Sequence, residues 1–296
     1  MVRIRAFCCG VGLSLLAQAA LAQSESPQRW VSAGGAISEW VVALGAEQRL
    51  VGVDSTSQQP SSLRELPSIG YQRQLAAEGI LALRPDLLVG SEEMGPPPVL
   101  EQLGAAGVRI ERLSAAGDLT ALQGNVRRLG ELLGEPERAE AVLADLDARL
   151  ARQAHWLREA QRSQAVPGVL LLVGQGGGNL LVAGSGTSAD WLLEHSGGHN
   201  LASHPGYKAF SSEALAALNP EVLLVTDRSL RGVEVLKAVL AQNPGLAASR
   251  AVREERVLVI DPTLLVGGLG PRTLETLASW SAAFYPQQPA LADGAP

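Results

Sequence analysis

Hydrophobic residues in this chain form two alternating patterns, short apolar runs and longer stretches with a helical period. The apolar runs have the length expected of strands buried on both faces of a parallel sheet. They lie at 30–32, 51–54, 87–89, 108–110, 169–173, 222–226 and 257–260. The helical stretches lie at 37–45, 99–106, 119–133, 189–196, 211–218 and 274–284. This alternation predicts an α/β fold in which helices cover parallel sheets.

One helical stretch, 136–164, is longer than the others and lies near the middle of the chain. At ~1.5 Å per residue it would span about 40 Å. We interpret it as a bridge between an N-terminal α/β lobe (23–135) and a C-terminal α/β lobe (165–296). The predicted fold is therefore two Rossmann-like lobes joined by one long α-helix, with a ligand cleft between them. A stiff bridge of this kind predicts small movements of the lobes.

An imperfect internal duplication supports two similar lobes. The segment EGILALRPDLLV, which starts at Glu78, is paralleled by EALAALNPEVLL, which starts at Glu213. Glu213 follows Glu78 by 135 residues, and Pro220 follows Pro85 by the same interval. One duplication indicates paired lobes rather than a solenoid. Tyr71, just ahead of the first copy, is expected on the rim of the cleft.

The first 22 residues have the pattern of a secretory signal peptide. Arg3 and Arg5 precede an apolar run at 11–21, which is too short for a transmembrane helix, and we expect cleavage after Ala22. Both cysteines lie inside this segment, so the mature chain has none. The whole chain has a formal charge of −6, and loss of the two arginines makes it −8. An acidic exported chain with dispersed basic residues gives no indication of a nucleic-acid partner.

Tyr71 and Arg73 are the strongest candidates for ligand binding. They lie on a loop in PSIGYQRQLAAEGILALRPDLLVGSEE, where a phenol can point into a cleft and a guanidinium two residues on can reach its oxygen. A phenolate is a hard oxygen donor suited to ferric iron. A free phenol titrates near pH ~10, so a neighbouring cation would help it to bind as the anion. By residue type alone, a tyrosine that packs in the cleft wall is the more ordinary interpretation.

Four segments carry a resemblance to a known family. They are RWVSAGGAISEWVVALG, LPSIGYQRQLAAEGILALRPDLLVG, GYKAFSSEALAALNPEVLL and DPTLLVGGLGPR. Together they resemble the haem-binding proteins of bacterial haem importers, which are periplasmic substrate-binding proteins with a helical backbone. The resemblance implies that Tyr71 is the axial ligand of ferric haem b and that Arg73 donates a hydrogen bond to its oxygen. It also implies a monomeric periplasmic carrier that delivers haem to the permease and ATPase subunits of an inner-membrane ABC importer.

The resemblance implies a docking role for two glutamates, and sequence position makes three other residues candidates for the site. Glu78 and Glu213 are expected to dock on the permease, although acidic residues also stabilise the first turn of a helix by complementing its dipole. Arg228 follows a strand of the second lobe and could meet a haem propionate or support the tyrosinate. Tyr207 and Lys208 lie opposite the tyrosine loop in the repeat register, where Tyr207 could pack on the porphyrin and Lys208 could pair with a propionate.

A second protein ligand for the iron is less well supported. His204 is the one histidine near the predicted cleft. Some relatives carry a histidine in the loop that corresponds to 175–179, and here that loop has the sequence QGGGN. This difference argues against a histidine–tyrosine pair and against two stacked haems.

The sequence leaves a second class of ligand open and disfavours an enzyme. The same scaffold could bind a corrinoid or a ferric siderophore; a siderophore supplies its own iron ligands and needs no protein phenolate. An enzyme is disfavoured, because the chain has no GxSxG elbow and no HExxH zinc motif, and the mature chain has no cysteine. Four scattered histidines do not form the cluster that a zinc or manganese carrier needs.

Overall fold

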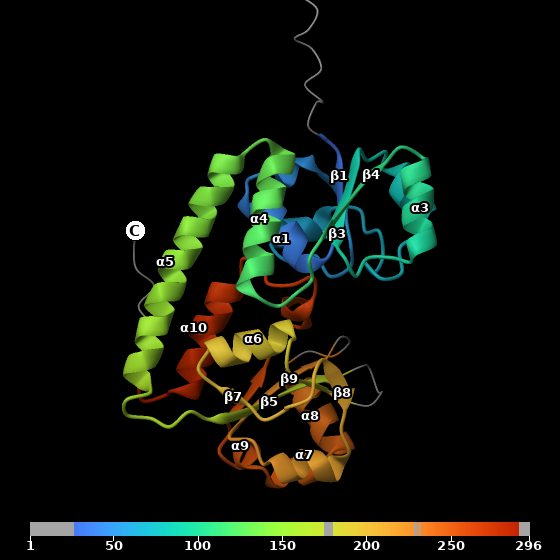
Figure 1. The fold of residues 1–296 in the computed structure, drawn as a ribbon. Helices are drawn as coiled ribbons and strands as arrows, with labels where there is room; N and C mark the ends of the chain where they lie inside the picture. The colour runs from blue at the N-terminus through green and yellow to red at the C-terminus, as the bar shows by residue number, and fades with distance from the viewer. Residues whose placement is uncertain (1–26, 175–179, 228–229, 231, 290–296) are drawn as a thin grey trace, which may run out of the picture.

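The structure, a computed structural model, describes residues 27–174, 180–227, 230 and 232–289. It has two α/β lobes, and the long helix α5 (Pro136–Ala160) runs beside both of them (Figure 1). The predicted signal peptide, the 175–179 loop and Arg228 lie outside the described residues. No helix of the described part is long and apolar enough to cross a membrane.

The N-terminal lobe is built on a parallel sheet of four strands. In spatial order these are β2 (Leu50–Val53), β1 (Trp30–Ala33), β3 (Leu87–Ser91) and β4 (Arg109–Leu113). Every residue of β1 and β3 is buried, as expected of central strands covered by helices on both faces. The predicted parallel arrangement is confirmed in this lobe.

Four α-helices accompany this sheet: α1 (Gly35–Ala43), α2 (Ala77–Ala82), α3 (Pro97–Ala105) and α4 (Leu119–Leu133). Two 3₁₀ turns, η1 (Glu47–Arg49) and η2 (Ser61–Glu65), lie in the connections. Helix α4 shows how local sequence sets its ends. Asp118 accepts a hydrogen bond from the Ala121 amide at 2.8 Å, and Gly134 closes the helix with a φ of 75°.

The C-terminal sheet is mixed rather than wholly parallel. Its parallel strands are β5 (Gly168–Gly174), β7 (His199–Asn200), β9 (Val222–Asp227) and β10 (Val257–Val259). At one edge, β6 (Leu181–Ala183) and β8 (Tyr207–Ala209) pair antiparallel. The sequence did not predict these two strands, because three residues between glycine-containing loops are too short for a recognisable apolar pattern.

Five α-helices complete this lobe: α6 (Ser188–His195), α7 (Ser212–Leu218), α8 (Val233–Gln242), α9 (Arg250–Arg253) and α10 (Thr273–Phe284). Two 3₁₀ turns, η3 (Pro244–Ala248) and η4 (Pro262–Leu265), precede α9 and α10 respectively. Helix α6 lies between the two lobes, and α10 lies beside α5 (Figure 1).

The duplication seen in the sequence is also present in the backbone. Helix α2 is followed by Arg84 with a φ of 48°, and α7 is followed by Asn219 with a φ of 42°. A proline follows each of these residues, and a buried parallel strand follows each proline. Positive φ values are uncommon outside glycine. Their recurrence at equivalent positions confirms that the two helix–strand units are structural repeats.

Helix α5 joins the lobes through side chains as well as through the backbone. Leu143, Leu146 and Trp156 are buried on it, and they belong to one hydrophobic cluster that includes Trp30 of the first sheet and Val169 of the second. The helix ends at Ala160, four residues earlier than predicted, and residues 161–163 form a turn. A core shared by both lobes favours a fixed separation between them.

Candidate ligand-binding cleft

The loop that carries Tyr71 is held from both sides by backbone hydrogen bonds. On one side the Ser55 amide donates to the Gly70 carbonyl at 2.8 Å. On the other side the Gly95 amide donates to the Gln72 carbonyl at 2.9 Å. Tyr71 is itself half-buried. The loop thus presents the phenol from a backbone anchored to the segments that follow β2 and β3.

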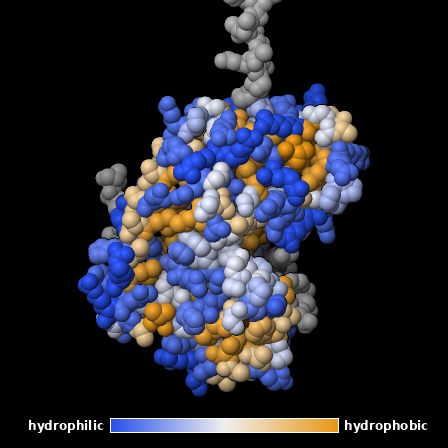
Figure 2. Space-filling view, in the orientation of Figure 1, coloured by the Kyte–Doolittle hydropathy of each residue, from blue (hydrophilic) through white to orange (hydrophobic). Residues whose placement is uncertain are grey.

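Tyr71 lies in the wall of a cleft formed by both lobes. A cavity of about 410 Å³ is bounded by Tyr71, Arg73 and Glu93 from the first lobe and by apolar and aromatic residues of the second, among them Leu181, Tyr207 and Leu265. A second cavity, of about 460 Å³, also includes Tyr71 in its wall. In Figure 2 the surface narrows between the lobes on the right of the view. The structure therefore places Tyr71 at the cleft between the lobes, as predicted from the sequence. Its side chain lines both of these cavities.

The electrostatics of the cleft centre on Arg73. Its Nη2 atom lies 2.5 Å from Oε1 of Glu93. This hydrogen bond raises the pKa of Arg73, and the phenols of Tyr71 and Tyr207 act in the same direction. Both tyrosines line the same cavity as the guanidinium, although they come from opposite lobes. The arrangement sets a hard oxygen donor beside a permanent cation.

Glu93 is a site residue that the sequence interpretation missed. It lies in the turn directly after β3, at the carboxyl end of a parallel strand, and such ends face the ligand crevice in open α/β sheets. Its Oε2 atom also accepts a hydrogen bond from Nε2 of Gln72 at 3.4 Å. The position of an acidic residue at the end of a buried strand was the available signal.

The structure separates the two candidates on β8. Tyr207, with 38% of its surface exposed, contributes to the cavity at Tyr71. Lys208 is exposed, and because successive side chains of a strand point to opposite faces, it lies on the other face of β8. Among the described residues of this cavity wall, Tyr207 is present and Lys208 is not. Arg228 lies outside the described residues.

His204 does not offer a ring nitrogen to the cleft. Its Nε2 atom lies 3.2 Å from the Val182 carbonyl, so this nitrogen is the donor, and its ring packs 5.0 Å from the ring of Phe210. Within the described part of the chain, Nδ1 is buried and has no hydrogen-bond partner. As a candidate second iron ligand, His204 is therefore disfavoured by its placement.

The two candidate docking residues occupy equivalent, exposed positions. Glu78 lies in the first turn of α2, and Glu213 lies in the first turn of α7. At α7, the Ser211 hydroxyl accepts a hydrogen bond from the Ala214 amide and caps the helix. Both glutamates are placed to complement a helix dipole and are also accessible to a partner.

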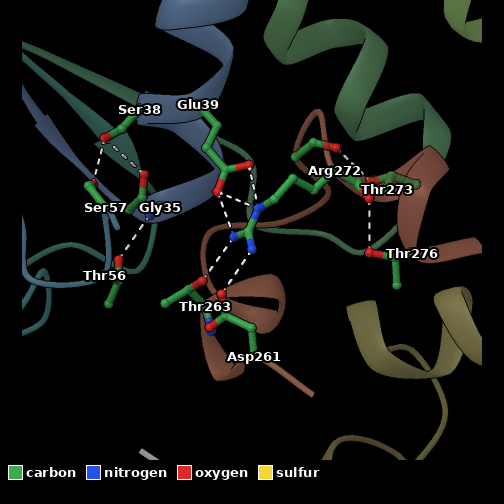
Figure 3. A network of polar contacts seen from close by, with 12 residues as sticks. Gly35, Ser38, Glu39, Thr56, Ser57, Asp261, Thr263, Arg272, Thr273 and Thr276 are labelled. Carbon is green, nitrogen blue, oxygen red and sulfur yellow. Dashed lines mark hydrogen bonds and ion pairs between the residues drawn. The ribbon is translucent and has the colours of Figure 1, made fainter. Parts of the chain in front are cut away.

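A buried ion pair connects the lobes behind the cleft (Figure 3). Arg272, which precedes α10, places Nη2 2.6 Å from Oε1 of Glu39 on α1, and Nη1 3.0 Å from Oδ2 of Asp261. Burial raises the pKa of Glu39 even though Arg272 opposes that shift. Burial disfavours the charged form of Arg272, but the hydrogen bonds and charges of Glu39 and Asp261 together outweigh this and raise the pKa of Arg272. In the sequence, the indication of this ion pair was Glu39, a charged residue within a largely apolar helix.

Several known proteins are similar to this chain in sequence and in structure. The family described as "Periplasmic binding protein" matches residues 31–264. A crystal structure of a periplasmic haem-binding protein from Pseudomonas aeruginosa is 62% identical, with a TM-score of 0.88 over 90% of this chain and 95% of that one. The periplasmic haem-binding protein RhuT from Roseiflexus sp. RS-1, in its apo form, is 38% identical, with a TM-score of 0.80 over 88% and 99% of the respective chains.

One curated relative is named for a different ligand. The vitamin B12-binding protein of Pectobacterium carotovorum is 32% identical over 152 residues, which are 51% of this chain and 53% of that protein. The match therefore spans about half of either chain. The family match, by contrast, extends over residues 31–264 and so includes strands of both lobes. The expectation of a binding protein rather than an enzyme is confirmed, and the chain belongs to the periplasmic binding protein family.

Proposed function

We propose that this protein captures ferric haem in the cleft at Tyr71 and delivers it to an ABC importer of the inner membrane. The observation that carries the proposal is that Tyr71 and Arg73 line the same cavity between the lobes, in a chain similar to haem-binding proteins over about nine-tenths of its length. Tyr71 is the axial ligand, bound as tyrosinate. Arg73 stabilises the negative charge on its oxygen.

The residues around Tyr71 fit a porphyrin in their chemistry. Leu181 and Leu265 supply apolar surface for the macrocycle, and Tyr207 can pack against its face from the second lobe. The propionates are anions and need cations near the cleft mouth. Because Lys208 lies on the face of β8 away from this cavity, we assign that role to Arg228.

Delivery requires docking on a membrane partner. We propose that Glu78 and Glu213, one on each lobe, contact basic residues of the permease. The carrier acts as a monomer in the periplasm, after cleavage of its signal peptide at Ala22. Each lobe then provides one acidic contact, in keeping with the repeat that relates the two helices.

A corrinoid is the second candidate ligand, favoured by the partial similarity to a vitamin B12-binding protein. Neither a corrinoid nor a ferric siderophore requires a phenolate from the protein. The haem proposal is therefore the one that gives a role to a phenol and a guanidinium in the same cavity wall.

Ligand-induced thermal stabilisation distinguishes these candidates. The mature protein is heated alone and with an excess of hemin, cyanocobalamin or a ferric siderophore. A ligand at 100 times its Kd stabilises the folded state by about 2.7 kcal/mol, which is a readily measured rise in Tm. We expect stabilisation by hemin alone. Stabilisation by cyanocobalamin or a siderophore, but not by hemin, would replace haem with that ligand.

A further inference from the structure

Glu93 contacts two side chains next to Tyr71. Its Oε1 atom lies 2.5 Å from Nη2 of Arg73, and its Oε2 atom accepts the 3.4 Å hydrogen bond from Gln72. Gln72 and Arg73 are the two residues that follow Tyr71 in the chain. One carboxylate thus bonds the side chains of both residues that come after the candidate iron ligand.

The carboxylate is connected to the lobe interior through Gln72. The Gln72 side chain is completely buried, and its Oε1 atom accepts a hydrogen bond from the Ser91 hydroxyl at 3.0 Å. Ser91 is the last residue of β3 and is also completely buried. A chain of contacts therefore runs from the end of a central strand through Gln72 to Glu93 and Arg73.

Backbone hydrogen bonds join the same two loops. Besides the bond from Gly95 to Gln72, the Leu75 amide donates to the Gly95 carbonyl at 2.8 Å. The turn that carries Glu93 and the loop that carries Tyr71 are thus tied together at two points. A side chain on one of them can determine the position of a side chain on the other.

Arg73 needs such support. Half of its side chain is exposed, and a long side chain of this kind loses rotamer entropy when it is held in one geometry. A guanidinium has five N–H donors in a rigid fork. A bond from Nη2 to Glu93 restrains the group at one end and leaves other donors for an oxygen nearby. Tyr71 and Tyr207 line the same cavity as Arg73, so a phenol oxygen is available on that side of the guanidinium.

We propose that Glu93 is a positioning residue of the haem site, which holds the guanidinium of Arg73 against Tyr71 and so determines how firmly the tyrosinate retains iron. The inference rests on the proposed function. In this proposal Glu93 has two opposite effects on the tyrosinate, one through its own charge and one through the orientation of Arg73. A negative charge in the cleft disfavours a phenolate, whereas a correctly oriented guanidinium favours it.

Two substitutions separate these effects. Glu93→Gln removes the charge and keeps a carbonyl oxygen for Arg73, at the expense of the longer contact with Gln72. Glu93→Ala removes both the charge and the acceptor. Among the described residues, the ionisable groups that line this cavity are Tyr71, Arg73, Glu93 and Tyr207. Both variants alter Glu93 and leave the other three groups in place.

The experiment loads each mature variant with hemin and titrates it with acid while the tyrosinate charge-transfer band is followed. Haem release to apomyoglobin at pH 7 is measured in parallel. We expect the band of Glu93→Ala to be half lost about one pH unit higher than that of Glu93→Gln, the scale of a single neighbouring charge. Its haem release should be several-fold faster, and Glu93→Gln should release haem no faster than the unsubstituted protein.

Controls distinguish the possible failures. Glu140→Ala, which breaks an exposed ion pair with Arg127 at 2.8 Å, should leave both measurements unchanged. Equal midpoints in Glu93→Ala and Glu93→Gln, whether shifted together or not at all, would overturn the positioning role. If Tyr71→Phe retains the band, the ligand assignment itself has failed, and this outcome is independent of Glu93.

Discussion

Glu39 and Arg272, separated by 233 residues in the chain, form an ion pair that joins the two lobes. Arg272 donates from both Nε and Nη2 to the Glu39 carboxylate, at distances between 2.6 and 3.0 Å. Only 5% of the Glu39 side chain is exposed. With the shared core along α5, this pair fixes the first lobe against the second on the side of α1 (Figure 3). A cleft between lobes held in this way is expected to change little when a ligand binds.

Arg272→Met should strongly destabilise the protein, because it leaves the Glu39 carboxylate buried without its main counterion. The expected loss in the free energy of unfolding is about 3 kcal/mol at pH 7. Burial already raises the pKa of Glu39, and the variant strengthens that shift, so the folded state binds a proton more tightly than the unfolded state. The variant's stability deficit should therefore shrink as the pH falls from 8 to 5.

Urea denaturation at several pH values measures both effects. Arg162→Met is the matched control, since it removes an arginine from an exposed pair with Glu159 at 2.7 Å. It should cost less than about 1 kcal/mol. Equal losses in the two variants would show that the Glu39 pair does not stabilise the lobe contact.

Gly117 lies where the first lobe meets helix α6 of the second. A Cβ atom at this position would come within 2.5 Å of the Ser188 backbone nitrogen. Gly117→Ala should therefore force the lobes to shift and lower the free energy of unfolding by about 1–3 kcal/mol. Gly124→Ala, inside α4 with no atom within 4 Å of the added methyl, should instead stabilise by about 0.5–1 kcal/mol. Thermal unfolding of both variants tests the prediction, and a neutral Gly117→Ala would contradict the close approach.

The ion pair of Glu111 with Arg128 predicts an acid-sensitive contribution to stability. Arg128 donates to the Glu111 carboxylate at 2.7 Å and holds the pKa of Glu111 below its ordinary value. A depressed acid pKa contributes stability above the unfolded value, near ~4.3, that is lost as the pH falls through the folded value. Glu111→Gln should therefore lose roughly 0.5 kcal/mol at pH 7 and less at pH 3. A deficit in urea denaturation that grows toward pH 3 would have the wrong sign.

Much of the fold was predictable from sequence because its central strands are continuous apolar runs. Two such runs lie at 169–173 in β5 and at 87–89 in β3. Each is fully buried and contains no polar residue that would interrupt the apolar pattern. Strands β6, β7 and β8 were not predictable in this way, because two or three residues have no measurable periodicity. Strands β6 and β7 pair with β5, and β8 pairs with β6, so their positions depend on connections that form only in the folded chain.

In the candidate site, too, local relations were predictable from the sequence and contacts between distant segments were not. Tyr71 and Arg73 were identified within one short motif, and their relation is local. Glu93 lies 20 residues from Arg73, and its bond depends on how the turn after β3 meets the tyrosine loop. His204 seemed available from its position in the sequence, but the fold directs its Nε2 atom to the Val182 carbonyl. Distances across loops of this kind cannot be read from residue spacing.

The paired glutamates predict a defect in delivery rather than in binding. In proteoliposomes that contain the cognate ABC importer, Glu78→Ala and Glu213→Ala should each reduce haem uptake, and the double variant should reduce it further. Both side chains are exposed, so haem affinity should remain unchanged, and loss of the charges that complement the helix dipoles should lower Tm only slightly. Glu131→Ala, which alters another exposed glutamate, is the control. Normal uptake by the double variant would assign both residues to their helix termini alone.

The most direct test of the account is a visible absorption titration of the mature protein with hemin, beside Tyr71→Phe. We predict saturation near one equivalent, with a tyrosinate charge-transfer band that is absent from the Tyr71→Phe complex. Saturation at two equivalents would require a second haem in the cleft. A hemin complex of Tyr71→Phe with the same spectrum as the unsubstituted protein would contradict the account, because iron would then be bound by another residue.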